Sequence, residues 1–247
     1  MIKVTSEVQS MVFPGGEVNI NIFSSVIIEA ALKSSDDVME LLLTVGALRR
    51  VNTNIKLDLV LKYFPYARQD RVCNPGEALS VEVFSSLVNS MKFERVEVWD
   101  IHNADSLALI NNVVHISQSE LLGKFPDTYD FLVAPDAGAR KKLEGTGIIV
   151  AGKTRNPSTG EITGTVIKKN EKLIEGSNLL IVDDICDGGR TFIELAKVLL
   201  EKGAASVDLY VTHGIFSKGL TPLYEAGISS ILTANNINNT GAYVIYP

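Results

Sequence analysis

The sequence predicts an α/β fold of two lobes, each built around a mainly parallel, doubly wound sheet. Two stretches favour this fold. Residues 179–182 form an apolar run that ends in acids and glycines, after which apolar residues recur at helical spacing from 192 to 200. Residues 36–50 have a helical apolar pattern, and residues 55–61 then alternate as a strand does. Alternating strands and helices indicate parallel strands joined by helical crossovers, with ligands at their carboxyl ends.

The other expected elements follow in chain order. The helix over 36–50 has Ser34 or Ser35 as its cap, and it is preceded by a turn at 13–17 and strands over 17–23 and 25–30. The later elements are a helix over 81–90, a strand over 95–100, a strand and helix start over 131–140, and strands over 207–213, 231–233 and 242–247. The chain is expected to cross between lobes near 115–120, which gives domains of 1–117 and 118–247.

Composition and charge narrow the class of protein. The chain has 247 residues, of which 46% are hydrophobic, and a net charge of −6 without a basic run, so we expect no nucleic-acid partner. The sequence contains no apolar run of membrane-spanning length and no signal-peptide pattern, so we expect no membrane partner. Two cysteines, Cys73 and Cys186, give no disulfide framework and favour a reducing compartment such as the cytoplasm.

The stretch after 179–182 carries the strongest chemical signal. Asp183 and Asp184 end the strand. The loop that follows consists of Asp187, Gly188, Gly189, Arg190 and Thr191. Backbone N–H groups of such a loop and helix start can hold a phosphate, which glycines allow to approach closely. The strand-end acids would repel phosphate, so ribose hydroxyls or Mg²⁺ are their expected partners. The pattern predicts a phosphorylated-sugar pocket; the alternative is an acidic loop in which Asp187 or Thr191 caps the helix.

A second polar segment follows the strand over 55–61. After aromatic residues at 63–66, it contains Arg68, Gln69, Asp70 and Arg71. Arginine donates forked hydrogen bonds to phosphates and glutamine can recognise a base edge, so this segment can hold a nucleotide. The alternative is a solvated charged loop beside partly buried aromatic side chains.

Residues 147–154 match the phosphate-loop pattern G-x-x-x-x-G-K-[ST], which ends in Lys153 and Thr154. The match fails on context, because its four intervening residues are themselves an apolar strand and Pro157 and Gly160 would break a following helix. We instead expect a mobile loop that carries Lys153 and Arg155. A plain surface hairpin with two cations is the alternative.

Several strings resemble the ribose-phosphate pyrophosphokinases, a family with the phosphoribosyltransferase fold. Residues 63–71 resemble its Tyr-Phe-x-Tyr-Ala-Arg-Gln-Asp string, residues 183–191 its acid pair and Asp-x-Gly-x-Thr loop, and residues 212–217 its Thr-His-Gly-x-Phe-Ser string. The resemblance covers most of the chain and implies a shortened, divergent member. It implies two phosphoribosyltransferase-like lobes, of which 1–117 binds ATP and 118–247 binds the sugar phosphate.

The resemblance implies roles at the nucleotide site. The turn at 13–17 resembles a hairpin that reaches a neighbouring subunit, where Phe13 and Glu17 would hold the adenine of ATP. His102, after the strand over 95–100, resembles a histidine that helps to hold Mg²⁺ with ATP, although a lone strand-end histidine more often contacts a backbone carbonyl. The other residues that would lie at the ATP site are Arg68, Gln69, Asp70 and Arg71.

The resemblance also implies roles at the sugar site. In residues 183–191, the two strand-end acids would bind ribose hydroxyls and the loop would bind the 5-phosphate. Asp136 resembles an aspartate that takes part in metal binding, and capping of the next helix is its alternative role. Lys153 and Arg155 would stabilise the charge on the group in transfer.

The reaction implied by the resemblance transfers the β,γ-diphosphate of Mg-ATP to the C1 hydroxyl of ribose 5-phosphate, which gives phosphoribosyl pyrophosphate and AMP. Mg²⁺ is the implied cofactor, and the implied assembly is a homo-oligomer whose ATP site is shared between subunits.

Three alternatives stay open. Gly188 replaces a threonine that is usual in the family and Arg190 adds a cation, which suggests a larger acceptor such as ADP-ribose. A phosphoribosyltransferase that consumes the activated sugar would have a similar loop, but it has no need of the nucleotide segment at 66–69. A catalytically silent regulatory relative would not need Lys153, Arg155 or the acid pair.

Overall fold

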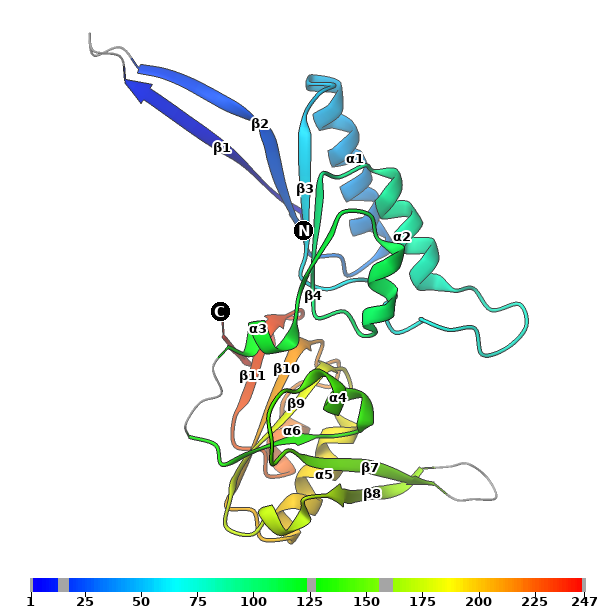
Figure 1. Ribbon diagram of the computed structural model, residues 1–247, viewed down its shortest axis with the longest axis vertical. Helices are drawn as coiled ribbons and strands as arrows, with labels where there is room; N and C mark the ends of the chain where they lie inside the picture. Colours follow the sequence, from blue (N-terminus) through cyan, green and yellow to red (C-terminus); the bar gives the residue numbers. More distant parts are fainter. Residues whose placement is uncertain (1, 13–17, 124–127, 156–161, 246–247) are drawn as a thin grey trace. The chain divides into compact units, whose positions relative to one another are not determined.

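The computed structural model describes residues 2–12, 18–123, 128–155 and 162–245 (Figure 1). The chain forms two compact units, Met1–Ile116 and Ser117–Pro247. The boundary predicted from the sequence, after residue 117, lies one residue further along the chain.

The described part of the first unit contains a five-stranded sheet. Its elements are β1 (Ile2–Val12), β2 (Val18–Ala30), α1 (Ser35–Val51), β3 (Lys56–Leu61), α2 (Ser80–Ser90), β4 (Arg95–Trp99), the 3-10 helix η1 (Ala104–Leu109) and β5 (Val113–Ile116). β1 pairs antiparallel with β2, and the later strands pair in parallel in chain order. The strands predicted over 17–23 and 25–30 are one strand, and the predicted turn at 13–17 lies outside the described residues.

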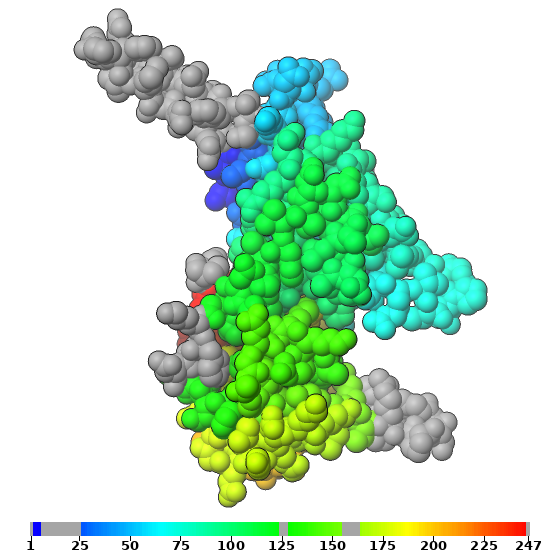
Figure 2. Space-filling model, in the orientation of Figure 1, coloured from blue at the N-terminus to red at the C-terminus, as the bar shows by residue number. Residues whose placement is uncertain are grey.

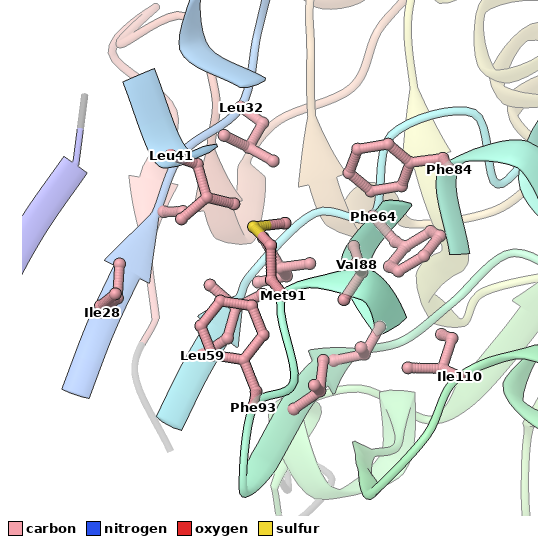
Figure 3. Close-up of a cluster of buried hydrophobic side chains, with 14 of the residues drawn as sticks. Ile28, Leu32, Leu41, Leu59, Phe64, Phe84, Val88, Met91, Phe93 and Ile110 are labelled. Atoms are coloured by element: carbon pink, nitrogen blue, oxygen red, sulfur yellow. The ribbon is translucent and has the colours of Figure 1, made fainter. Parts of the chain in front are cut away.

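Because the strand order of the first unit never reverses, its mainly parallel sheet lacks the doubly wound connections that we predicted. α1 and α2 instead share one core on one face of the sheet. Leu41 of α1, Leu59 of β3 and Val88 of α2 belong to the same buried cluster, drawn in Figure 3. Phe64 and Phe84 meet edge to face in this cluster, with ring centroids 5.0 Å apart.

Helix α1 begins one residue before its predicted start and is capped by one of the two predicted serines. The Ser34 hydroxyl accepts a hydrogen bond from the N–H of Asp37 at 3.2 Å, and the Asp37 carboxylate accepts one from the N–H of Ser34 at 2.9 Å. This reciprocal capping satisfies two backbone donors at the helix start. Ser34 is therefore the cap, and Ser35 is the first helical residue.

The described part of the second unit contains a seven-stranded sheet. Its elements are α3 (Gln118–Leu122), β6 (Phe131–Ala134), α4 (Ala137–Lys142), β7 (Ile149–Arg155), β8 (Ile162–Lys169), the 3-10 helix η2 (Glu171–Leu173), β9 (Asn178–Cys186), α5 (Arg190–Glu201), β10 (Ser206–Gly214), α6 (Thr221–Glu225), β11 (Ile231–Asn236) and β12 (Tyr243–Val244). The strand order is β12–β11–β10–β9–β6–β7–β8, and β8 alone pairs antiparallel, with β7. This sheet is doubly wound, as predicted.

β9 lies at the centre of the second sheet, and its sequence shows why. Leu179, Leu180, Ile181 and Val182 are each 0% exposed. A continuous apolar run of this kind is typical of a parallel strand that is covered on both faces. Within the described ranges, no helix is both long and apolar enough to cross a membrane.

The two faces of α1 give a direct test of the first core. Leu41 is 0% exposed, whereas Leu43, two residues further along the same helix, is 66% exposed. We expect Leu41→Ala to lower the free energy of unfolding by about 2–5 kcal/mol, because it leaves a cavity in the core. The matched control Leu43→Ala should change it by about 0.5 kcal/mol or less. Urea denaturation followed by circular dichroism measures both, and equal effects would contradict the assigned core.

Candidate active site

The strand order of the second unit reverses between β6 and β9, and three predicted site residues lie at this reversal. The chain runs outward from β6 through β7 and β8, returns to β9 beside β6, and then continues outward in the other direction through β10. In open α/β sheets, ligands bind at the carboxyl ends of the strands at such a point. Asp183 and Asp184 lie near the end of β9, and Asp136 follows β6 after one residue.

These three carboxylates have different surroundings. Asp184 is 5% exposed, and its Oδ2 lies 3.1 Å from Nζ of Lys142 at the end of α4. The Asp183 Oδ1 accepts a hydrogen bond from the N–H of Asp184 at 2.9 Å. Burial, followed by the charges of Asp184 and Asp136, nevertheless raises the pKa of Asp183 well above its usual range. Lys142 therefore offsets the charge of Asp184, whereas burial disfavours the charged form of Asp183.

Lys142 is not among the site residues predicted from the sequence. This residue ends α4, a short helix that Asp136 caps by accepting hydrogen bonds from the N–H groups of Gly138 and Ala139 at 2.8 and 2.9 Å. A lysine one short helix after a strand-end aspartate was the available signal. The lysine reaches Asp184 because β6 pairs in parallel with β9, and the sequence alone does not reveal that pairing.

The loop after β9 leaves the start of α5 without a side-chain cap. Gly189 is the N-cap residue, with a φ of +77°, and no side chain caps the helix. The alternative in which Asp187 or Thr191 caps α5 is therefore wrong. A Cβ at position 189 would lie 3.1 Å from Leu223, so both backbone conformation and space favour glycine. The N–H groups at the start of this 12-residue helix suit an anion.

The residues just after β10 hold this loop in place through backbone hydrogen bonds. The N–H of Phe216 donates to the Cys186 carbonyl at 3.0 Å, and the N–H of Ser217 donates to the Asp187 carbonyl at 3.2 Å. The segment 212–217, singled out in the sequence for its resemblance, therefore supports the backbone of the loop.

Arg190 is the first residue of α5, and its side chain already has a partner. Its Nε lies 2.7 Å from Oε1 of Glu194, four residues further along the helix, and the side chain is 82% exposed. The suggestion that an arginine in this loop serves a larger, substituted phosphate gains no support from this geometry.

Lys153 and Arg155 lie in a strand, so the prediction that a loop carries them is wrong. Both belong to β7, which pairs with β8 as a hairpin, Lys153 opposite Thr165 and Arg155 opposite Ile162. The Lys153 side chain is exposed. The rejection of the phosphate-loop pattern is confirmed, because β7 leads into another strand.

In the first unit, the predicted nucleotide segment lies between β3 and α2. Part of the segment between β3 and α2 projects from the body of this unit in Figures 1 and 2, where it is cyan. Arg68, Gln69 and Arg71 are exposed, whereas Ala67 just before them is 2% exposed and anchors the segment in the core. Three of the predicted polar side chains therefore lie at the surface of this unit.

Asp70 has a structural partner in Asn103, the N-cap residue of η1. Its Oδ2 accepts a hydrogen bond from Nδ2 of Asn103 at 2.8 Å, and its Oδ1 lies 3.1 Å from Nε of Arg71. Burial acts to raise the pKa of Asp70, but these hydrogen bonds outweigh it and the pKa is lowered. Because Asn103 follows His102 directly, the contact joins the loop of the predicted ATP residues to the loop of the predicted metal histidine.

Two predicted nucleotide residues, Phe13 and Glu17, lie outside the described residues. Among the residues that the structure does describe, no three His, Cys, Asp or Glu side chains are placed to hold a metal ion together.

The raised pKa of Asp183 predicts a pH-dependent stability. Its pKa in the folded protein lies above the usual 3.8, so the folded state binds the proton more tightly than the unfolded chain. Stability is then lost as the pH rises above about 4 and the carboxylate ionises. Asp183→Asn cannot ionise, so we expect its Tm to exceed that of the wild type by a margin that grows from pH 4 to pH 8. Calorimetric scans measure this margin, and a constant or shrinking one would contradict the assignment.

Two family models match the chain in sequence order. The model described as "N-terminal domain of ribose phosphate pyrophosphokinase" matches residues 4–91, and the model described as "Phosphoribosyl transferase domain" matches residues 107–224. The ribose-phosphate pyrophosphokinase of Thermococcus kodakarensis is 28% identical over 94% of this chain and 86% of its own length. That of Pyrococcus furiosus is 27% identical over 91% of this chain and 84% of its own length.

A solved structure shares the fold. The crystal structure of phosphoribosylpyrophosphate synthetase from Mycobacterium smegmatis superposes with a TM-score of 0.70 and 24% identity, and the match covers 92% of this chain and 80% of that one. The two matched family models, the relatives along nearly the whole chain and the shared fold agree with the resemblance of the motifs. The chain therefore belongs to the ribose-phosphate pyrophosphokinase family of enzymes.

Proposed function

We propose that this protein transfers the β,γ-diphosphate of Mg-ATP to the C1 hydroxyl of ribose 5-phosphate and releases AMP. One observation carries the proposal: in a member of this family, the acids near the end of β9 adjoin a helix start without a side-chain cap, at the point where strand order reverses. The loop thus offers acceptors for sugar hydroxyls and donors for a phosphate over a few successive residues.

The residues of the second unit can share the work of holding the sugar phosphate. Asp184, paired with Lys142, accepts hydrogen bonds from ribose hydroxyls, and Asp183 lies beside it. The backbone N–H groups of 188–191 hold the 5-phosphate. Such binding fixes the C1 hydroxyl relative to ATP, and positioning of this kind accounts for much of the rate of phosphoryl transfer.

Mg²⁺ suits this chain as a complex with the nucleotide. Mg²⁺ usually takes one or two protein carboxylates together with substrate phosphates, so a preformed three-residue cluster is not required. Asp136 caps α4 through Oδ1, which leaves Oδ2 as a donor for the metal. His102 is the second proposed ligand. When bound, Mg²⁺ would offset the negative charge of the ATP phosphates.

The exposed polar side chains of the first unit suit the rest of ATP. Arg68 and Arg71 would bind its phosphates, and Gln69 would contact its base. Phe13 and Glu17 of a neighbouring copy would hold the adenine, so the proposed enzyme is a homo-oligomer with a shared ATP site. We propose that it acts on these small molecules in the cytoplasm.

Lys153 and Arg155 on β7 are the proposed catalytic cations. Negative charge builds up on the diphosphate during transfer, and cations placed where that charge develops stabilise the transition state. No general base is assigned, because positioning and charge neutralisation can supply most of the barrier reduction.

Product masses test the proposed reaction directly. With Mg-ATP and ribose 5-phosphate, we expect mass spectrometry to show AMP together with ribose 5-phosphate that has gained a diphosphate. Parallel reactions without acceptor, and with ADP-ribose as acceptor, are the controls. Lack of AMP would contradict the proposal. Activity with ADP-ribose but not with ribose 5-phosphate would show that ADP-ribose is the acceptor. Activity seen only when phosphoribosyl pyrophosphate and a base are supplied would point to a phosphoribosyltransferase.

Lys153→Ala tests the catalytic cations. We expect kcat to fall by about 10²–10³-fold, because the lysine would stabilise charge that appears only in the transition state. KM for either substrate should change much less. Lys169→Ala removes another exposed lysine from the same hairpin and should leave kcat within about twofold of the wild type. An unchanged kcat in Lys153→Ala, or equal losses in both variants, would contradict the assigned role.

A further inference from the structure

Lys218 lies against the proposed phosphate loop, although the sequence gives no reason to single it out. Its Cε and Cδ lie 3.7 and 3.8 Å from the point that a Cβ on Gly188 would occupy. The aliphatic part of the lysine therefore lies beside Gly188 of the loop. Lys218 is exposed, and its ammonium group forms no ion pair with any residue in the described ranges.

The backbone holds Lys218 close to this loop. The N–H of Ser217 donates to the Asp187 carbonyl at 3.2 Å, and the N–H of Gly219 donates to the Phe216 carbonyl at 2.9 Å. The residue thus sits in a tight turn that is hydrogen-bonded on one side to the phosphate loop. This turn follows β10, which pairs in parallel with β9 up to Gly214, opposite Cys186.

Two other cations near the site already have partners. Lys142 pairs with Asp184 at 3.1 Å, and Arg190 pairs with Glu194 at 2.7 Å. A terminal phosphate carries nearly two negative charges at pH 7 and would lie close to the acids of the same loop. Backbone N–H groups alone would have to offset this repulsion, unless a further cation contributes.

We infer that Lys218 binds the terminal phosphate of the sugar phosphate and supplies the cation of the loop at 187–191. The stem of Lys218 lies within ordinary contact distance of position 188, which places the lysine beside the loop. Lys218 is then a binding residue and takes no part in the transfer step. This inference rests on the proposed function, because it assigns a ligand to the same loop.

Lys218→Met tests the assignment, because methionine keeps most of the stem and removes the charge. We expect KM for ribose 5-phosphate to rise about 10- to 100-fold, as for loss of a charge-assisted hydrogen bond. The kcat and the KM for Mg-ATP should stay within about twofold. Lys197→Met is the matched control, since Lys197 is an exposed lysine on α5, and it should leave all three constants unchanged.

A hydroxyl at position 188 should partly restore binding. The φ of Gly188 lies outside the left-handed region, and the nearest atoms to an added Cβ are those of Lys218 at ordinary contact distance. Gly188→Thr in the Lys218→Met variant therefore fits, and its hydroxyl can donate to the phosphate. We expect KM for ribose 5-phosphate to be at least threefold lower in this double variant than in Lys218→Met. A purely structural role for Lys218 would give no such recovery.

Calorimetric binding separates this inference from the proposed reaction. Ribose 5-phosphate should bind the wild type, bind Lys218→Met about 10- to 100-fold more weakly, and bind Lys197→Met like the wild type. Equal affinity in all three proteins would overturn the role of Lys218 and leave the reaction untouched. If the three affinities follow the expected order but the wild type forms no AMP, the proposed reaction is wrong and the role of Lys218 is supported. No binding of ribose 5-phosphate to the wild type would overturn both.

Discussion

The ion pair between Lys142 and Asp184 is the interaction on which the geometry of the proposed sugar site depends. A buried carboxylate must be paired, hydrogen-bonded or protonated, and ionisation of two adjacent ones is costly in free energy. The lysine meets one acid only because α4 follows β6 directly and β6 lies beside β9. The reversal of strand order thus creates the site and also supplies the cation that lets an acid pair persist there.

An acid pair and a phosphate site within one loop would repel each other if nothing intervened. The chain separates the two kinds of group, because different residue types follow one another along the loop. Carboxylates end β9, glycines follow, and the helix start then presents N–H groups that no side chain caps. Backbone hydrogen bonds from residues 216 and 217 hold the carbonyls of 186 and 187, which fixes the loop between two parallel strands. The fold therefore keeps opposite charges in neighbouring places without relying on long, flexible side chains.

Much of this arrangement could be predicted from the sequence, because periodicity and turn residues are local. The apolar run 179–182, the capped helix α1 and the rejection of the phosphate-loop pattern are all confirmed. The contribution of Lys142 could not be predicted, since it depends on which strands are neighbours. Arg190 is a different case, because its partner Glu194 lies four residues along the same helix, where such pairs meet. The first unit lacks doubly wound connections because its strands pair in chain order, which no local pattern reveals.

The first unit uses an acid in a comparable way. Asp70 was expected to contact ATP, yet its carboxylate accepts hydrogen bonds from Asn103 and Arg71. A carboxylate turned toward a triphosphate would weaken binding, whereas one that is held by Asn103 organises the segment and leaves Arg68 and Gln69 exposed. In both units, then, an aspartate with a protein partner sets the position of groups that can face a ligand. The residue types at such a site can be predicted from sequence, but only tertiary contacts decide which of them turn inward.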